Sequence, residues 1–443
     1  MKRTEVSRRN FLTAAAGVTI VPRHVLGGAG YKAPSDKLNI ACIGVGGKGA
    51  VDAQGVASEN IIALCDVDDE RAAKTFQAFP AARRYRDFRI MLEKEKSIDA
   101  VTISTPDHVH AIATLMAMRL GMHVFCQKPL VHSLYEARLI GKASKKYRVA
   151  TQMGIQGHCE EGVRRIRQWI KAGAIGRVRE VQYWTNRPIW PQAIDRPTDT
   201  PETPATLDWD LWLGPAAQRP YHPAYHPFKW RGWWDFGTGA LGDMACHGFD
   251  AAFWILDLGN PSRVVAETTP VKPETAPLVS RIEYDFPAKG DRPPVKLIWR
   301  DGDLKPSRPK WTPQGEPVPP VGHSGQLFIG DEGMIAADIY GGNPAIFPES
   351  RRKEVLANMA DEKEPASPGI YKEWIAACKG GPTPGASFDY SVPLTMIVLL
   401  GNLAVRTGEV IEWDPVAFKV ANCSSPNQYI RREYRRGWEL PEV

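Results

Sequence analysis

The sequence predicts an α/β domain built on a doubly wound parallel sheet, followed by an α+β domain with a large, mainly antiparallel sheet. Up to about residue 150, short and almost uniformly apolar segments alternate with helical ones, which is typical of parallel strands buried on both faces. A glycine-rich turn follows the first of these segments. Beyond about residue 152 the alternation ends, and spaced strand-like segments with turn residues between them indicate antiparallel pairing.

The length and composition of the chain agree with two globular domains. Its 443 residues are too many for one compact core, and 43% hydrophobic and 24% charged residues are typical of a soluble protein. The formal net charge is +6, but about +4 of it falls within residues 1–30, so the remainder gives no reason to expect a nucleic-acid partner. Past residue 30 we expect no membrane span, because no apolar run approaches the roughly 20 residues that one needs. Seven scattered cysteines without CxxC spacing predict neither a disulfide framework nor a zinc site, and we expect no metal.

Residues 1–30 are predicted to be a twin-arginine signal peptide rather than part of the fold. Ser7-Arg8-Arg9-Asn10-Phe11-Leu12 precedes a short, weakly apolar stretch that ends near Val21, which is the layout of a twin-arginine leader. We therefore expect a periplasmic or otherwise exported protein. Within the remainder we expect a first domain at residues 36–155 and a second at residues 156–443.

A glycine-rich turn near the start of the first domain is predicted to cradle a dinucleotide. The apolar segment Lys37–Ile43 runs into Gly44-Val45-Gly46-Gly47-Lys48-Gly49, and a helical stretch starts at Ala50. In such a GxGxxG turn, one glycine makes the tight bend, one lets the backbone approach a pyrophosphate and one lets the helix pack on the strand. The free N–H groups of the helix N-terminus then face the phosphates. We assign cofactor binding in a Rossmann domain to Gly44, Gly46, Gly47 and Gly49.

The residue after the second predicted strand indicates which dinucleotide is bound. Ile61–Cys65 ends at Asp66, about 20 residues past the first glycine. A carboxylate at this point accepts hydrogen bonds from the adenosine ribose and repels a 2′-phosphate. No arginine follows immediately to hold such a phosphate. Asp66 therefore favours NAD, with NADP as the alternative.

Two polar clusters follow the next predicted strands of the first domain. Thr105-Pro106-Asp107-His108-Val109-His110 follows the strand Ile98–Ser104 and precedes a helix at Ala111–Arg119, and Gln127-Lys128-Pro129 follows the strand Met122–Cys126. Ligands of a doubly wound sheet bind at the carboxyl ends of its strands. We therefore expect both clusters to line the cofactor site.

The second domain is predicted from turn-bounded segments. A helix at about Glu160–Ala172 is closed by Gly173 and Gly176. The expected strands are Val178–Thr185, Arg263–Thr269, Ser280–Phe286, Val295–Trp299, Gln326–Gly330 and Met334–Asp338, and two C-terminal helices are expected at Tyr371–Cys378 and Pro393–Arg406. Proline-rich stretches at residues 187–227 and 305–320 are predicted to be long loops, which are often functional in compact domains.

A helix that begins at Gly239 carries the most informative residues of the second domain. Asp243 and His247 are four positions apart, so both project from one face of this helix. A carboxylate beside an imidazole holds its orientation and favours its protonated form, which suits a proton shuttle. The alternative is an ordinary pair on a helix surface that adds little stability.

The motifs, in this order, resemble those of the glucose-fructose oxidoreductase and inositol dehydrogenase family (Gfo/Idh/MocA). The likeness covers roughly residues 36–260 and includes the glycine-rich turn, the acid after the second strand, Thr-Pro-Asp-His-x-His and Lys-Pro. The family's Gly-Gly-x-x-x-Asp-x-x-x-His signature also matches, with Thr238 standing between two glycines. Where the family usually has Glu-Lys-Pro, this chain has Gln127, which removes a carboxylate that would raise the affinity of Lys128 for its proton.

The resemblance implies a role for each site residue. Lys128 contacts the nicotinamide ribose and a substrate hydroxyl, His247 is the catalytic acid/base, and Asp243 is its partner or a hydroxyl ligand. Cofactor contacts are implied for Thr105, Pro106, His108, His110, Gln127 and Lys128. Substrate contacts are expected from Lys128, Gln156, Arg231, Trp234, Asp243 and His247, the tryptophan because aromatic faces stack well on sugar rings.

The reaction that the resemblance implies is hydride transfer between nicotinamide and a carbinol carbon of a sugar or polyol, in a homo-oligomer (dimer or tetramer). Export leaves cofactor recycling open, because little free NAD(H) exists outside the cytoplasm. The cofactor is either retained and recycled by a second substrate, or oxidised and reduced within one cycle, as in NAD-dependent glycosidases. The second scheme makes the protein a hydrolase or lyase with no net redox change. A Rossmann-type binding protein without turnover is disfavoured by the joint presence of Lys128, Asp243 and His247.

Overall fold

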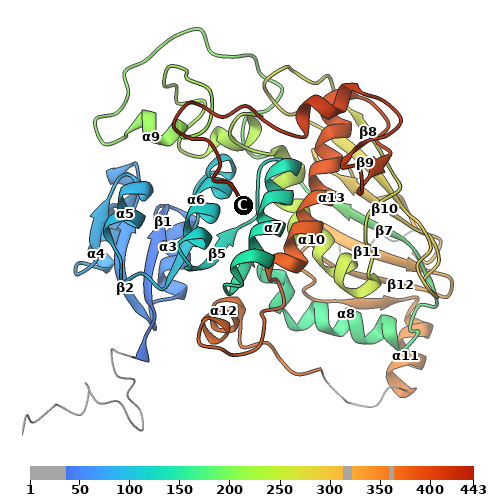
Figure 1. Cartoon of the computed structure of the whole chain (residues 1–443). Helices are drawn as coiled ribbons and strands as arrows, with labels where there is room; N and C mark the ends of the chain where they lie inside the picture. Colours follow the sequence, from blue (N-terminus) through green and yellow to red (C-terminus); the bar gives the residue numbers. More distant parts are fainter. Residues whose placement is uncertain (1–35, 313–321, 359–363) are drawn as a thin grey trace, which may run out of the picture.

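The computed structural model describes residues 36–312, 322–358 and 364–443, and within them a parallel and a mixed β-sheet organise the chain (Figure 1). The parallel sheet occupies one side of the molecule and the mixed sheet the other, with α7, α10 and α13 between them. The predicted signal peptide, residues 1–30, lies outside the described residues.

Residues 39–154 form the predicted doubly wound sheet. Its strands lie in the order β3-β2-β1-β4-β5-β6 and all pair in parallel, which is the strand order of a Rossmann fold. The strands are Asn39–Ile43 (β1), Asn60–Cys65 (β2), Arg83–Tyr85 (β3), Ala100–Ile103 (β4), His123–Gln127 (β5) and Thr151–Gly154 (β6). The helices are Lys48–Gly55 (α3), Asp69–Ala78 (α4), Phe88–Lys94 (α5), Asp107–Arg119 (α6) and Leu134–Tyr147 (α7). Every residue of β4 is buried, which explains why this strand carries no alternating polar residues.

Residues 178–347 contain the strands of the mainly antiparallel sheet, so this prediction is confirmed. Its strand order is β13-β12-β11-β7-β10-β9-β8, and only β7 and β10 pair in parallel. The strands are Val178–Trp184 (β7), Arg263–Thr268 (β8), Ser280–Phe286 (β9), Val295–Arg300 (β10), Gly325–Gly330 (β11), Met334–Asp338 (β12) and Ala345–Phe347 (β13), and Trp413–Asp414 (β14) pairs with Lys419–Val420 (β15). The helices are Gln156–Cys159 (η2), Glu161–Lys171 (α8), Trp209–Leu213 (α9), Lys229–Gly232 (η3), Gly239–Leu256 (α10), Glu349–Asn358 (α11), Ile370–Cys378 (α12), Phe388–Thr407 (α13) and Ser425–Tyr429 (η4).

Helix α13 packs in the interior between the two sheets. It has 20 residues and is long and apolar enough, by length and composition, to cross a membrane, but 72% of its apolar window is buried inside the protein. It contacts α7 on one side and α10 on the other. One weakly apolar helix of this length therefore follows residue 30, but it gives no clear membrane span. Packing against helices on both sides accounts for the apolar composition.

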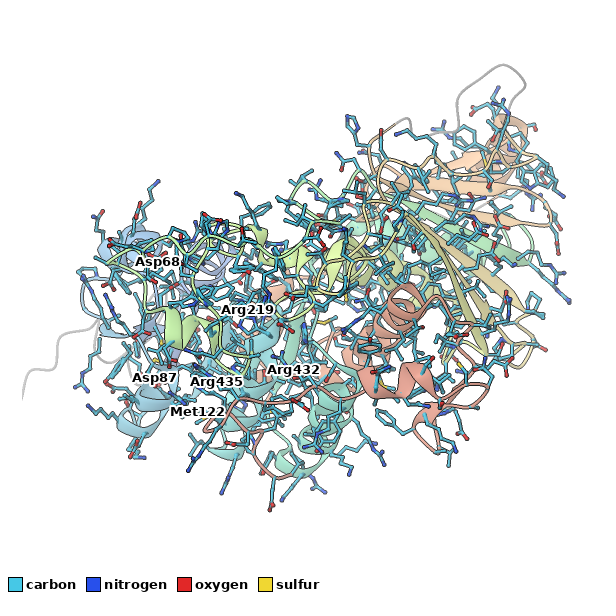
Figure 2. All side chains as sticks on the ribbon, turned by 90° about the horizontal axis from the view of Figure 1, so that it is seen from above. Asp68, Asp87, Met122, Arg219, Arg432 and Arg435 are labelled. Carbon is cyan, nitrogen blue, oxygen red and sulfur yellow. The ribbon has the colours of Figure 1, made fainter. Side chains whose placement is uncertain are left out.

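The C-terminal tail crosses back to the half of the molecule that contains the parallel sheet. The Tyr434 hydroxyl donates to the Glu136 carboxylate at 2.9 Å. Trp438 is buried and packs against Phe88, with ring centroids 6.0 Å apart. Figure 2 shows Arg435 of the tail over the same half of the molecule as Asp87. The tail therefore covers α5 and α7 from outside.

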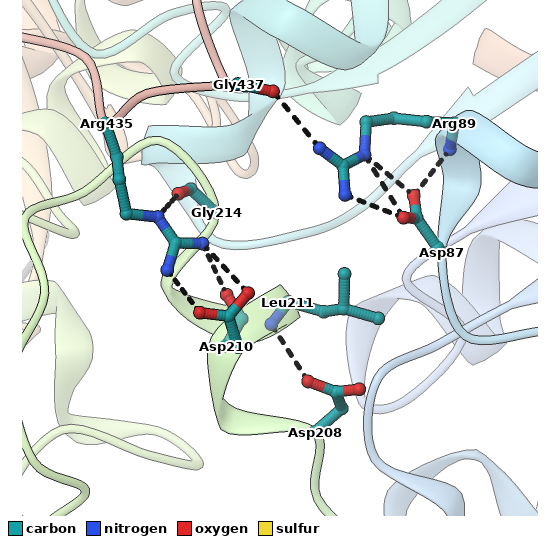
Figure 3. A network of polar contacts seen from close by, with 8 residues as sticks. All are labelled: Asp87, Arg89, Asp208, Asp210, Leu211, Gly214, Arg435 and Gly437. Carbon is teal, nitrogen blue, oxygen red and sulfur yellow. Dashed lines mark hydrogen bonds and ion pairs between the residues drawn. The ribbon is translucent and has the colours of Figure 1, made fainter.

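The tail also holds the short helix α9, which belongs to the proline-rich loop that precedes η3 (Figure 3). The Arg435 guanidinium pairs with Asp210 and donates to the Gly214 carbonyl at 2.9 Å. The Asp208 carboxylate caps α9 by accepting from the Leu211 amide at 3.0 Å. The loop is thus fixed at the side that faces the parallel sheet.

Candidate active site

A cavity of about 480 Å³ lies at the carboxyl ends of the parallel strands. Residues from the glycine-rich turn line one end, and residues from β5, η3 and α10 line the other. Of the sequence-predicted residues, those that line it are Gly44, Gly46, Gly47, Asp66, Thr105, Pro106, Gln127, Lys128, Gln156, Arg231, Asp243 and His247. The structure therefore brings together twelve of the sixteen residues singled out from sequence. The other four, Gly49, His108, His110 and Trp234, do not line the cavity.

The glycine-rich turn is closely packed, as a dinucleotide cradle requires. Gly44 has a φ of +74°, a conformation that L side chains rarely adopt. A Cβ on Gly49 would fall 1.8 Å from the Gly44 carbonyl oxygen, so only glycine lets α3 approach β1 this closely. Gly49 thus has the helix-packing role of the third glycine without lining the cavity.

Asp66 lines the cavity at the end of β2 and also organises the glycine-rich turn. One carboxylate oxygen accepts from the amides of Val45 and Gly46 at 2.8 and 3.0 Å. The other accepts from the Asp68 amide at 3.0 Å. Burial raises the pKa of Asp66, and these three N–H groups oppose the rise. A carboxylate offers about four acceptor positions, so one remains for a ribose hydroxyl.

Three cations at the same end of the cavity were missed in the sequence reasoning. They are Lys48, Arg71 and Arg86. A guanidinium nitrogen of Arg71 lies 3.3 Å from the place where a Cβ on Gly47 would stand. Arg86 pairs with Asp69, whereas Arg71 makes no ion pair with any described residue. Positive charge over the turn fits a bound pyrophosphate.

At the other end of the cavity, one carboxylate joins two cations. Lys128 Nζ donates to the Asp243 carbonyl at 2.6 Å and to its Oδ1 at 2.9 Å, and Arg231 Nε donates to the same Oδ1 at 3.1 Å. The Arg231 guanidinium also lies over the rings of Trp230 and Phe228. Burial alone would raise the pKa of Asp243, but Lys128 and Arg231 hold it well below its usual range.

His247 is placed in the cavity, but its expected partnership with Asp243 was wrong. Its Nδ1 is buried and has no hydrogen-bond partner among the described residues. Its ring lies edge-on to Tyr340, with centroids 5.0 Å apart. Burial, followed by the charge of Lys128, lowers the pKa of His247 to about 3, although Asp243 acts in the opposite direction. The two side chains share a helix face, yet the carboxylate bonds to the two cations instead.

His108 and His110 do not line the cavity, which corrects the expectation that both contact the cofactor. The His108 ring nitrogens bond to the carbonyls of Phe236 and Trp212 at 3.3 and 3.0 Å. The His110 ring nitrogens bond to the carbonyls of Pro129 and Thr105 at 2.8 and 2.9 Å. Both residues belong to α6, which begins at Asp107 rather than Ala111, and both are buried with their ring nitrogens bonded to backbone carbonyls.

The predicted substrate residues that follow β6 divide in a similar way. Gln156 and Arg231 line the cavity, whereas Trp234 is buried in the core, where its ring lies 5.1 Å from the Arg406 guanidinium. Trp230 and Tyr340 line the cavity in its place. The aromatic face expected from the sequence is therefore present in the cavity. It is supplied by Trp230, which is close to Trp234 in sequence, and by Tyr340, which is distant from it.

A buried carboxylate on α3 explains why an amide rather than a carboxylate stands at position 127. The Gln127 amide nitrogen donates to Asp52 Oδ2 at 2.9 Å. Asp52 is fully buried and also accepts from Ser104, Tyr371 and Lys48 at 2.6, 2.7 and 2.8 Å. A buried carboxylate thus lies beside position 127 on the neighbouring helix, and the Gln127 amide is the matching neutral donor.

We expect Gln127→Glu to destabilise the protein by roughly 1–3 kcal/mol at neutral pH, because it removes a donor from a buried carboxylate and places a second carboxylate beside it. The loss should shrink as the pH falls, since protonation of one carboxyl restores the hydrogen bond. Denaturant unfolding at two pH values checks this. Gln127→Met is the matched control, because it removes the donor without adding charge and should show no such pH dependence. A Glu variant as stable as wild type at neutral pH would contradict the assignment.

A family described as "Oxidoreductase family, NAD-binding Rossmann fold" matches residues 38–155, and its "C-terminal alpha/beta domain" matches residues 163–292. The D-apiose dehydrogenase of Paraburkholderia graminis is 33% identical over 116 residues, which are 26% of this chain and 31% of that protein. The levoglucosan dehydrogenase of Pseudarthrobacter phenanthrenivorans is 24% identical over 198 residues, which are 44% of this chain and 42% of that protein. The matches thus span less than half of either relative.

A solved structure shows the same fold over most of the chain. The WlbA dehydrogenase from Bordetella pertussis, in complex with NADH and UDP-GlcNAcA, superposes with a TM-score of 0.57 and 16% identity. The superposition covers 85% of this chain and 99% of that one. Because the two parts of the family description together match more than half of the sequence, the chain belongs to the Gfo/Idh/MocA family of oxidoreductases with an NAD-binding Rossmann fold.

Proposed function

We propose that the protein is an exported NAD-dependent oxidoreductase that transfers a hydride between nicotinamide and a carbinol carbon of a sugar or polyol. The observation that carries the proposal is one cavity with a dinucleotide cradle at one end and the ion pair of Lys128 and Asp243 at the other. The sugar and anhydrosugar dehydrogenases among its relatives support this substrate class and favour net oxidation over redox-neutral bond cleavage.

The lining fits a dinucleotide. The backbone of Gly46 and Gly47, with Arg71 above them, binds the pyrophosphate, and Asp66 accepts from the adenosine ribose. NAD supplies the hydride acceptor. The protein residues at the other end orient the substrate.

Lys128 is the residue that holds the reacting oxygen. Its Nζ carries three protons and donates two of them to Asp243, so one remains for a substrate hydroxyl. Arg231 fixes the same carboxylate and thereby the direction of the third N–H. The rings of Trp230 and Tyr340 offer apolar faces for the C–H groups of a sugar.

Product analysis tests this proposal. The purified protein is incubated with a panel of sugars, polyols and glycosides, with and without an external electron acceptor. A keto sugar or lactone formed at the expense of the acceptor supports the proposal. Cleavage of a glycosidic bond without net oxidation would overturn it in favour of the redox-neutral scheme.

The purified mature protein is expected to retain NAD(H), because residues from the proline-rich loop line the cavity opposite the glycine-rich turn. His226 in this loop pairs with Asp68 at 2.8 Å, and both side chains are largely buried. Denaturation followed by mass analysis identifies the retained cofactor. We expect His226→Ala to release it about tenfold faster, which corresponds to about 1.4 kcal/mol.

The neighbouring His222 provides the matched control for cofactor retention. It pairs with Asp199, whose side chain is 75% exposed, so His222→Ala should leave the release rate unchanged. Protein isolated without cofactor and with only millimolar affinity for NAD would contradict the expectation.

Export is proposed from residues 1–30, with Arg8 and Arg9 as its determinants. Joint replacement of both by lysine should retain the full-length protein in the cytoplasm, as fractionation of expressing cells would show; unchanged export contradicts the proposal. The homo-oligomeric state of the protein remains a prediction. The domain boundary between residues 155 and 156 also remains a prediction.

A further inference from the structure

Phe228 and Tyr340 are the most exposed aromatic residues in the described part of the chain, with exposed fractions of 42% and 41%. Both line the cavity of the candidate active site. The other well-exposed large hydrophobic residues among those described are aliphatic, and none of them lines this cavity. Single exposed hydrophobic side chains are common on soluble proteins, but two exposed rings at one cavity indicate a ligand with apolar faces.

Phe228 and Trp230 form an aromatic wall on one side of the cavity. The Arg231 guanidinium lies over both rings, 4.6 Å from the centroid of Phe228 and 4.3 Å from that of Trp230. Trp190 meets the Phe228 ring edge-on, with centroids 5.9 Å apart. Because Trp230 is only 8% exposed, one ring of the wall lies inside the cavity, and the Phe228 ring follows it at the exposed end. The wall therefore offers two ring faces in succession.

Tyr340 reaches the polar group of the cavity from a different element. It lies in the turn after β12, where Asp338 Oδ1 accepts from its amide at 2.8 Å. Its ring meets the His247 ring edge-on, with centroids 5.0 Å apart. The aromatic wall instead reaches α10 one turn earlier, because Arg231 bonds to Asp243. The two exposed rings therefore flank the stretch of α10 that carries Asp243 and His247.

Gln156 adds a polar group beside Tyr340. A Cβ on the next residue, Gly157, would lie 3.2 Å from the Tyr340 carbonyl oxygen, so η2 packs directly against this turn. Gln156 lines the cavity, and its side-chain amide has no hydrogen-bond partner among the described residues. An amide offers both donors and an acceptor, which match the hydroxyls of a sugar. Aromatic faces with a polar group at their edge thus fit the apolar faces and hydroxyl edges of a pyranose ring.

We propose that the substrate is a glycoside rather than a free monosaccharide, and that Phe228 and Tyr340, the aromatic clamp, hold its second pyranose ring at the exposed end of the cavity. The inference rests on the proposed oxidoreductase function. The ring that is oxidised lies deeper, where Lys128 bonds to the reacting oxygen. This inner ring loses one hydride to nicotinamide and one proton to His247, the acid/base that the family resemblance implies. The glycosidic bond stays intact.

Matched substrates isolate the effect of the second ring. Each sugar of the panel is compared with its methyl glycoside and with a disaccharide that carries the same sugar at its non-reducing end. The methyl glycoside locks the anomeric centre without adding a ring. We expect kcat/KM to be roughly tenfold higher for the disaccharide than for the other two, because only the disaccharide reaches the aromatic clamp.

Phe228 provides the decisive variants, because its ring bonds to no reacting group. Phe228→Ala should lower kcat/KM for the disaccharide roughly three- to tenfold and leave that for the monosaccharide within about twofold of wild type. Phe228→Leu keeps an apolar side chain beside Arg231 but lacks a flat face, so it should lose the preference as well, whereas Phe228→Trp should keep it. Tyr340→Phe should also keep it, because stacking does not need the hydroxyl.

Ile189 supplies the matched control. It is 58% exposed and precedes Trp190 in sequence, but it does not line the cavity. Ile189→Ala should therefore keep the wild-type preference for the disaccharide.

The outcomes separate the inference from the proposed function. If wild type oxidises the disaccharide no better than the monosaccharide or the methyl glycoside, or if Phe228→Ala keeps the preference or lowers both activities alike, the clamp does not bind a second ring, although the oxidoreductase proposal stands. If no sugar is oxidised, the oxidoreductase proposal fails. Calorimetric titration of the cofactor-loaded protein with the same sugars then tests the clamp by itself. The inference requires tighter binding of a disaccharide than of its monosaccharide, and loss of this difference in Phe228→Ala; equal affinities in wild type would overturn it.

Discussion

Replacing Lys128 with alanine is expected to lower turnover by about two to four orders of magnitude, the range for lost proton handling and charge stabilisation at a reacting oxygen. The substitution removes the one ammonium among the described residues that bonds to Asp243, and with it the N–H that we assign to the substrate hydroxyl. Steady-state kinetics together with the bound-cofactor content checks this. The loss should fall mainly on kcat, because the glycine-rich turn at the far end of the cavity is untouched.

Lys296 supplies a matched control for Lys128. It is also an ion-paired lysine, with Nζ 2.8 Å from Glu283, but it lies on β10 and outside the cavity. Lys296→Ala should leave turnover within a few-fold of wild type. Near-normal turnover of Lys128→Ala would remove this residue from the reaction and with it the proposed position of the substrate.

Asp243→Asn is expected to cost about 3–5 kcal/mol of folding free energy at neutral pH, because Lys128 and Arg231 would then face each other without a charged partner in a largely buried site. The pKa of Asp243 is lower in the folded than in the unfolded protein, so its stabilising effect is complete above the unfolded value of about 3.9. That effect is lost as the pH falls through the folded value. The difference between variant and wild type should therefore stay constant from neutral pH to about pH 5 and shrink below about pH 4.

Denaturant unfolding across this pH range measures the predicted difference. Asp331 provides the comparison, because it pairs with Arg179 at 3.0 Å while both side chains are nearly half exposed. Asp331→Asn should change stability far less. Equal effects of the two substitutions would show that the ion pairs of Asp243 contribute no more to folding stability than a surface ion pair does.

Local patterns in the sequence were enough to predict most of the fold. The bounds of β9 and β12 agree with the prediction at both ends, because regular alternation or a continuous apolar run has clear limits. The glycine-rich turn was equally clear, because the close approach of Gly49 to Gly44 leaves no room for a side chain. Such features depend on residues that are neighbours in the chain.

The parts of the site that were missed depend on contacts between distant segments. Gln127 looked like the loss of a carboxylate, since its partner Asp52 lies 75 positions away in sequence. Tyr340 enters the cavity from the turn after β12, which carries no motif. Asp107 also lines the cavity, and the signal that could have identified it is its place as an acidic residue at the start of the helix that follows Thr105-Pro106.

Single-turnover reduction of the retained cofactor tests the central claim most directly. Protein purified with its cofactor oxidised is mixed with each sugar or polyol in the absence of any external acceptor, and nicotinamide absorbance and fluorescence are recorded. We predict that at least one substrate reduces the bound nicotinamide in a single phase, and that Lys128→Ala holds the same cofactor but reduces it about 10²–10⁴-fold more slowly. A cofactor that stays oxidised with every sugar and polyol, or a Lys128→Ala variant that reduces it at the wild-type rate, would contradict the account.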